Sequence, residues 1–252
     1  MTRPRRTPRT RRPRRSLGTR RSLGLVALLP LLLAGACGDD DGDGGPAGDA
    51  AGQGALAGTL LVEEGTCADA GVTGGSYFRM VQPGGTPEEG PYVPNGDSPC
   101  GDKTWTPLSP GEAGGLRLGE LQPQPEPPFA DSGDGQAAQI VAPQRWFAVN
   151  FAVATNEVDP QTGGGTSPPT LSVSGGAVTG DLRAWAVAWN GQHFNQGSPK
   201  PDGSMPGATA PVSGTFDEAS GAVVVEWTSQ IVGGPFNNFT GIWYLEGTID
   251  GG

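Results

Sequence analysis

Apolar and polar side chains alternate in several short runs of this chain, and clusters of glycine or proline separate the runs. A period of two residues places alternate side chains on opposite faces of a β-strand, so each run predicts one strand. The chain holds 44 glycines and 25 prolines in 252 residues, a proportion at which disorder has to be considered. Six tryptophans and eight phenylalanines argue against disorder, because a disordered chain has no need of them. We therefore expect a folded β domain with long loops.

The longest runs predict the strands most clearly. Three runs place apolar side chains on one face: Phe147, Val149, Phe151 and Val153; Val223, Val225, Trp227, Ser229 and Ile231; and Trp243, Leu245 and Ile249. Between Leu182 and Trp189, alanines form one face and larger apolar residues form the other. This pattern predicts a strand buried on both sides, which a second layer can approach closely. Shorter candidate strands are residues 59–63, 77–81, 139–141 and 171–174.

Turn residues lie between these runs, at residues 175–176, 217–221 and 233–235. The segment Thr215–Trp227 predicts a hairpin with a loop of about five residues. No convincing amphipathic helix follows Cys37. About eight to ten short strands over roughly 195 residues predict an all-β fold, a single antiparallel β-sandwich or barrel with long Gly/Pro-rich loops. The pattern does not distinguish a sandwich from a barrel.

The first 37 residues differ in charge from the rest of the chain. They contain ten arginines and no acidic residue, whereas all 26 acidic residues lie after Cys37. Residues 1–22 form a basic segment, and Leu23–Ala36 form an apolar stretch of 14 residues. A helix that crosses the hydrocarbon core needs about 20 apolar residues, so this stretch is too short to span it. The layout is that of a signal peptide.

The end of the apolar stretch, residues 33–37, reads Leu-Ala-Gly-Ala-Cys. It resembles the lipobox of bacterial lipoproteins, although Ala34 stands where leucine is more usual. The resemblance implies a diacylglycerol on the sulfur of Cys37, cleavage before that residue, and stable membrane attachment through two acyl chains. The alternative is an ordinary secretory signal cleaved after Ala36, which leaves Cys37 as a thiol.

Residues 19–24, Thr-Arg-Arg-Ser-Leu-Gly, resemble the twin-arginine export signal, which implies export of an already folded protein. The alternative is that this arginine pair is one of several in an arginine-rich segment. With either signal, the expected location is the cell envelope, on the extracytoplasmic face of a membrane, at the cell surface or in the periplasm.

Three segments are expected: a signal peptide (1–36), the lipidated cysteine with an acidic flexible linker (37–54), and the β domain (55–252). After Cys37, six basic residues face 26 acidic ones, a net charge of −20. Such a surface repels phosphate backbones, so nucleic acid is excluded as a partner. Asp39, Asp41, Asp43 and Gly44 match the start of a calcium-binding EF-hand loop, but Ala50 stands where that loop needs glutamate. The linker interpretation is therefore preferred, and no metal site is expected.

Two cysteines remain, Cys67 and Cys100. Outside the cytoplasm such a pair predicts a disulfide, which would stabilise a loop-rich domain by about 3.5–4 kcal/mol. A metal site is the alternative, but the single histidine is distant in sequence and no Cys-x-x-Cys spacing occurs.

Few catalytic groups are present. A Ser-His-Asp triad would have to use His193, and no nucleophile elbow, phosphate-binding loop or metalloprotease motif occurs. We expect no enzymatic activity and no cofactor. The residues after the linker resemble no family of known activity, and a purely structural envelope protein is one interpretation. The other two are a non-enzymatic binding module and, as an alternative, an extracytoplasmic hydrolase acting on glycans.

The segment 189–205 is the candidate ligand site, because functional residues favour loops on rigid scaffolds. Its candidate side chains suit a carbohydrate or a protein surface, and two asparagines of the 233–240 turn join them. The candidates are Trp189, His193, Asn195, Lys200 and Asp202, with Asn237 and Asn238. The alternative is a structural loop whose polar side chains cap its own turns.

Lipid attachment predicts that Cys37→Ser moves the protein from the membrane fraction to the soluble fraction, because no acyl chain then holds it. Intact mass spectrometry of the mature wild-type protein should show a diacylglyceryl increment and loss of residues 1–36. An uncut chain in the cytosolic fraction, with the same distribution in both proteins, would contradict the prediction.

Overall fold

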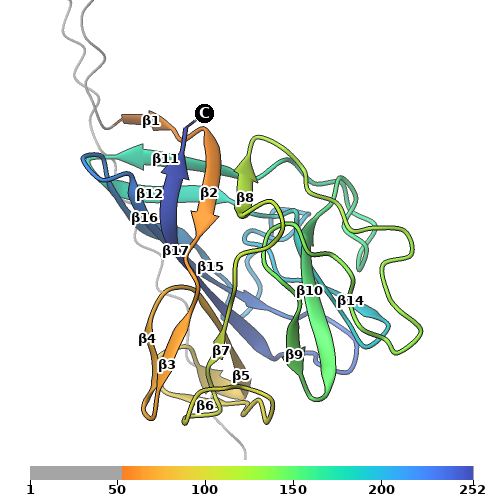
Figure 1. The fold of residues 1–252 in the computed structure, drawn as a ribbon. Helices are drawn as coiled ribbons and strands as arrows, with labels where there is room; N and C mark the ends of the chain where they lie inside the picture. Colours follow the sequence, from red (N-terminus) through yellow and green to blue (C-terminus); the bar gives the residue numbers. More distant parts are fainter. Residues whose placement is uncertain (1–52, 252) are drawn as a thin grey trace, which may run out of the picture. The chain divides into compact units, whose positions relative to one another are not determined.

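The computed structural model describes residues 53–251, and this range contains seventeen β-strands and no helix (Figure 1). Nothing in that range forms a helix of the length and hydropathy that crossing a membrane requires. The expected signal peptide, Cys37 and the linker up to residue 52 lie outside the described residues. The first strand, β1 (Gln53–Ala55), already includes the last two residues of the expected linker. The all-β class is confirmed.

Eleven strands form one large, curled antiparallel sheet. Its main path runs through β1, β11 (Thr170–Ser174), β12 (Ala177–Asp181), β15 (Ala210–Asp217), β16 (Ala222–Gln230), β17 (Thr240–Asp250), β2 (Gly58–Val62) and β8 (Gly115–Leu118). The long strand β17 pairs with β16 along one edge and has two partners along the other. Residues 240–244 pair with β5 (Tyr77–Thr86) and residues 247–250 pair with β2. Strands β6 (Gly90–Tyr92) and β7 (Thr106–Pro107) continue the sheet from β5.

A second sheet has four strands in the order β14 (Gln192–Asn195), β13 (Trp185–Trp189), β10 (Val149–Thr155) and β9 (Gln144–Trp146). A separate hairpin is formed by β3 (Thr66–Ala68) and β4 (Gly71–Gly74). Buried side chains of the large sheet and of the four-stranded sheet belong to one hydrophobic core. The fold is therefore sandwich-like, with the curled sheet as a half-barrel and the smaller sheet packed against its apolar face.

Three tryptophans join the two sheets at the centre of this core. Trp185 of β13 and Trp227 and Trp243 of β16 and β17 are each at most 2% exposed. The ring of Trp185 meets the other two edge-on, at centroid distances of 5.1 and 5.3 Å, and those two stack at 6.0 Å. Burial of one such side chain contributes roughly 4–6 kcal/mol before the cost in entropy. The alternation predicted for 223–231 and 243–249 is thereby confirmed.

The strand predicted to be buried on both sides is β13, and its alanine face is covered as expected. The covering layer is a loop rather than a sheet. Ala137 of that loop packs against Ala152 of β10. A Cβ on Gly135 would lie 2.4 Å from the carbonyl oxygen of Ala188 and 2.8 Å from the Cβ of Ala152. Small residues on both sides therefore allow the loop backbone to approach this closely.

Two turn predictions are also confirmed. Strands β15 and β16 form the expected hairpin, in which the backbone N–H of Gly221 donates to the carbonyl of Asp217. Gly175 and Gly176 connect β11 to β12 with φ angles of 58° and 81°. Two successive positive φ values define a type I′ turn, which suits the twist of paired strands and favours glycine.

Two strand predictions are wrong in part. The run from Phe147 to Val153 is strand only from Val149 onward, because Trp146 pairs with Val149 and the two residues between them form a hairpin turn. Phe147 is consequently 52% exposed instead of sharing the buried face. Residues 139–141 form no strand, and Val141 makes only an isolated bridge with Pro110.

One glutamine side chain connects the two sheets. Gln122 is 1% exposed, and its amide pairs with edge strand β8 as a further strand would. Its Oε1 accepts from the N–H of Arg117 at 2.9 Å, and its Nε2 donates to the carbonyl of Gly115 at 2.9 Å. Its backbone N–H donates to Oγ1 of Thr155, and its carbonyl accepts from the N–H of Thr155, on β10.

Gln122→Ala should lower the free energy of unfolding by about 2–4 kcal/mol, because it leaves two buried backbone groups of β8 without partners. Urea denaturation measures the loss. Exposed Gln136 provides the control, and Gln136→Ala should have little effect. Equal stability of the two variants would contradict the role of Gln122 in joining the sheets.

Candidate functional site

The structure distributes the sequence-predicted ligand residues over three places. Asn195, Lys200 and Asp202 line one surface hollow of about 470 Å³. His193 lines a second hollow of about 430 Å³, and the two hollows share part of their walls. Trp189 lines a small cavity in the core between the sheets.

Asn195 and Lys200 are buried, and their polar groups bond within the protein. The side-chain Nδ2 of Asn195 donates to Oδ1 of Asp159 and to the carbonyl of Arg183, each at 3.1 Å. The Nζ of Lys200 donates to the carbonyl of Asn195 at 2.9 Å and to Oγ of Ser229 at 2.6 Å. Burial lowers the pKa of Lys200 to about 8, although the charge of Asp159 opposes this change.

His193 and Asp202 are more accessible but do not converge on a common point. The imidazole of His193 lies 4.8 Å from the ring of Phe129, and burial lowers its pKa against the opposing charge of Asp159. Asp202 is exposed, and its Oδ1 accepts from the N–H of Ser204 at 2.9 Å, which closes a tight turn.

Asn237 and Asn238 stabilise the loop that connects β16 to β17. Oδ1 of Asn237 accepts from the N–H of Gly233 at 2.7 Å, and Oδ1 of Asn238 accepts from Nε2 of Gln230 at 3.0 Å. These bonds are of the turn-capping kind that asparagine makes in structural loops.

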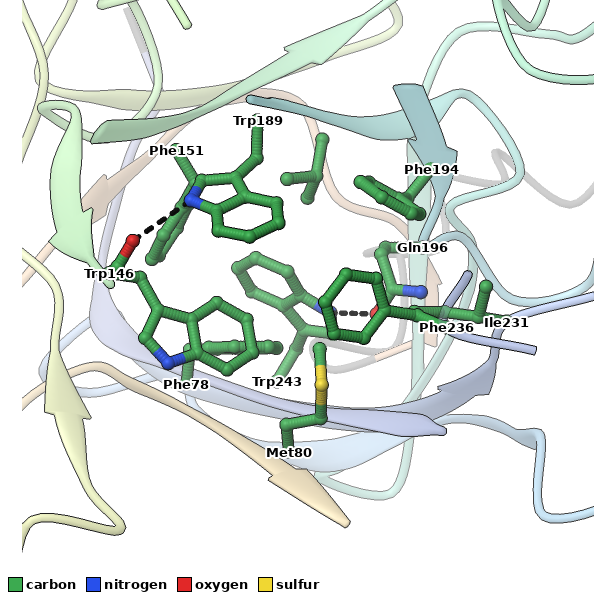
Figure 2. A pocket seen from close by; sticks show the side chains of 11 residues that line it. Phe78, Met80, Trp146, Phe151, Trp189, Phe194, Gln196, Ile231, Phe236 and Trp243 are labelled. Atoms are coloured by element: carbon green, nitrogen blue, oxygen red, sulfur yellow. Dashed lines mark hydrogen bonds between the residues drawn. The ribbon is translucent and has the colours of Figure 1, made fainter. Parts of the chain in front are cut away.

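The cavity beside Trp189 has a volume of about 30 Å³ (Figure 2). Seven aromatic side chains line it: Phe78, Trp146, Phe151, Trp189, Phe194, Phe236 and Trp243. The one polar side chain in its wall is Gln196, whose Oε1 accepts from Nε1 of Trp243 and whose Nε2 donates to the carbonyl of Asn195. A volume of this size admits about one or two waters and no organic ligand, and apolar walls of this kind stay dry. We therefore attribute it to core packing.

A larger hollow lies on the face of the large sheet that points away from the core. Trp227, Trp243 and Phe78 pair across β16, β17 and β5 and point inward, so their sequence neighbours point outward. The outward side chains form two rows: Glu226, Tyr244 and Tyr77 in one, and Thr228, Ile242 and Arg79 in the next.

These two rows form the floor of an open groove of about 560 Å³, which we call the outer groove. Pro87 and Glu88, from the turn between β5 and β6, line it together with residues 208–211 and Ser213 of the segment that leads into β15. Its side chains include hydroxyls, two carboxylates and a guanidinium. A rigid sheet therefore carries closely spaced groups that can hydrogen-bond a polar ligand.

Aromatic rings hold the guanidinium of Arg79 at the outer groove. Its central carbon lies 3.4 Å from the ring centre of Tyr92 and 4.0 Å from that of Trp105. Tyr77 meets Trp105 edge-on at 4.7 Å and stacks on Tyr244 at 4.8 Å. Cation–π contacts of this kind contribute about 0.5–2 kcal/mol each and fix the plane of the guanidinium.

Hydrogen bonds fix the same cluster. Nη2 of Arg79 donates to Oγ1 of Thr104 at 3.0 Å, and Nε1 of Trp105 donates to Oδ2 of Asp102 at 3.1 Å. The backbone N–H of Thr104 bonds Oδ1 of Asp102 and lowers the pKa of that carboxyl, so it stays charged near neutral pH.

The predicted disulfide is present and supports this cluster. Cys67 of β3 is bonded to Cys100, which lies five residues before Trp105. The β3–β4 hairpin thereby stays against the segment that carries Trp105. Gly71 of β4 allows the indole to lie close to the backbone, because a Cβ there would be 2.6 Å from Nε1 of Trp105.

The phenols of the groove are protonated at neutral pH. Burial, followed by the charge of Glu226, raises the pKa of Tyr77. Burial, followed by the charge of Glu246, raises the pKa of Tyr244 to about 12. Both side chains therefore remain hydrogen-bond donors over the physiological range.

The sequence analysis did not identify the outer groove. The missed residues are Tyr77, Arg79, Tyr92, Trp105, Glu226 and Ile242. The alternation had indicated that Glu226 and Thr228 turn away from the apolar face. It contained no information that β5 and β16 lie on either side of β17, because strand order is a property of long-range pairing.

Comparison of the chain with protein-family models, with curated proteins and with solved structures gives no match. Within residues 53–251, no three His, Cys, Asp or Glu side chains are grouped in a way that could hold a metal ion. The argument for function therefore depends on the geometry of the hollows.

The buried Lys200 generates a prediction on stability. Its pKa is about 8 in the folded protein and 10.5 as a free side chain, so between these values the unfolded chain binds more protons. Stability should therefore rise with pH in this window, by roughly 3 kcal/mol relative to Lys200→Met, which has no titrating amine. Urea unfolding of both proteins from pH 7 to pH 10.5 measures this. Parallel pH curves would contradict the prediction.

Proposed function

We propose that this chain is a lipid-anchored protein of the bacterial cell envelope, and that its β domain is a non-enzymatic binding module for a carbohydrate. The outer groove is the proposed ligand site. The observation that carries this proposal is the open groove itself, with hydroxyl, carboxylate and guanidinium groups on a rigid sheet. The lipobox-like sequence that ends at Cys37 supports the membrane anchor.

The chemistry of the groove suits a sugar better than an apolar ligand. Sugars present many hydroxyls, which pair with side chains such as Ser213, Thr228 and Glu226. They also present patches of C–H groups, which can pack on Ile242 and on the edge of Tyr77. Because strands and stacked rings hold these side chains, little conformational entropy is lost on binding.

The place of the groove in the sheet fits a tethered binding module. A linker that ends at Gln53 joins the domain at β1, which is an edge strand of the large sheet. The outer groove lies over β15, β16, β17 and β5, and five strands separate β1 from β5 (Figure 1). At about 4.8 Å per strand, this is roughly 29 Å of sheet. Such an anchor leaves the far part of the groove open to ligands.

A glycan-acting hydrolase is the second candidate. Two carboxylates, those of Glu88 and Glu226, line the outer groove, and glycoside hydrolysis uses a carboxyl pair. Chromatography of the oligosaccharides after incubation distinguishes the two functions. A binding module returns them unchanged, whereas a hydrolase shortens them and loses this activity in Glu226→Gln.

A glycan array probed with the full-length Cys37→Ser protein tests the proposed site. Ile242→Trp should reduce binding of the recognised glycan at least about 10-fold, because the indole fills the floor of the groove. Leu61→Trp is the matched control, since Leu61 is an exposed apolar residue of the same sheet that does not line the groove. Unchanged binding by Ile242→Trp, or equal loss in both variants, would contradict the proposal.

A further inference from the structure

Arg79 differs from the other arginines of the domain in its electrostatic surroundings. Residues 53–251 contain six basic and 21 acidic side chains, a net charge of −15. The other three arginines in this range each have a carboxylate partner within 4 Å: Arg117 with Glu120, Arg145 with Asp97, and Arg183 with Asp181. In the part of the chain that the structure describes, Arg79 has none, although acidic residues are more than three times as numerous as basic ones.

Its position compensates for the missing carboxylate only in part. Two ring faces and Oγ1 of Thr104 contact the guanidinium. Its Nε is buried and has no hydrogen-bond partner among the described residues. A donor left unpaired in this way costs free energy, and a ligand that accepts a hydrogen bond from the guanidinium recovers part of it.

We propose that Arg79 recognises an anionic group, and that the ligand of the outer groove is an oligosaccharide that carries a carboxylate, as a uronic acid does. This inference rests on the proposed function and names the class of sugar. The planar fork of a guanidinium matches a carboxylate with two parallel hydrogen bonds. The ring faces on either side hold the plane of Arg79, so its orientation is set before the ligand arrives.

The other charges of the groove limit how acidic the ligand is. Glu88 and Glu226 line the same groove, and neither lies within 4 Å of the guanidinium. Their carboxylates accept hydrogen bonds from sugar hydroxyls and repel further anionic groups. The groove therefore favours a sparsely charged glycan with one carboxylate over a dense polyanion.

Calorimetric titration of the full-length Cys37→Ser protein tests this inference. The probes are a xylo-oligosaccharide that carries one glucuronic acid branch and the same oligosaccharide after reduction of its carboxyl group to an alcohol. The wild-type groove should bind the acidic form about 10- to 100-fold more tightly, as a charge-assisted bidentate contact predicts. Raising the salt concentration from about 20 to 500 mM should weaken binding of the acidic form and leave that of the reduced form nearly unchanged.

The variants distinguish recognition from a purely structural role. Arg79→Gln should bring the affinity ratio of the two probes to about one, and Arg79→Lys should leave an intermediate ratio, because it keeps the charge but loses the planar fork. Arg117→Gln is the matched control, since Arg117 is an exposed, paired arginine of edge strand β8, and it should keep the full ratio. A structural role for Arg79 would weaken both probes together and leave their ratio unchanged.

The outcomes separate this inference from the proposed function. A wild-type ratio near one, failure to bind either probe, or a ratio that persists in Arg79→Gln overturns the role of Arg79. The proposed function survives those results if neutral glycans bind in a manner that Ile242→Trp abolishes. If Arg79→Gln does not fold, the ratio in Arg79→Lys and the salt dependence of the wild type decide the matter. Preference for a densely charged polyuronate over the singly charged probe overturns the limit on charge.

Discussion

The contact among Trp185, Trp227 and Trp243 holds the two sheets together, and the rest of the domain is arranged around it. Gln196 supplies the polar partners of this contact, because its carbonyl accepts from Nε1 of Trp227 and its side-chain Oε1 accepts from Nε1 of Trp243. Large rings fill the space that glycine-rich loops cannot fill, and the hydrogen bonds set the registry of the rings. A chain with so much glycine and proline obtains a stable core in this way.

The same strands that build the core also build the outer groove. When Trp227, Trp243 and Phe78 point inward, the pleat turns Glu226, Tyr244 and Tyr77 to the other face. The disulfide between Cys67 and Cys100 then holds Trp105 beside Arg79. Core packing and site geometry are therefore coupled through strand register, since a shift by one residue would exchange the two faces.

Much of the fold follows from local patterns, and the exceptions have physical reasons. The alternation in 223–231 and the Gly175-Gly176 turn are visible in the sequence, because each depends on neighbouring residues alone. The turn at Phe147 is not, because an apolar residue at a positive φ is uncommon and no glycine marks the turn. The residues predicted for the site form a loop whose polar groups largely satisfy one another, as Asn195 and Lys200 do.

The sequence by itself determined the β class, the pairing of Cys67 with Cys100, and the residues that belong to the apolar face of each long strand. These properties follow from side-chain periodicity and from the count of cysteines. Only the tertiary structure decided that β17 lies between β16 and β5, and that Arg79 comes to lie between the rings of Tyr92 and Trp105. The reason is that strand order results from the packing of the whole core, and no local run of residues encodes which distant strand becomes its neighbour.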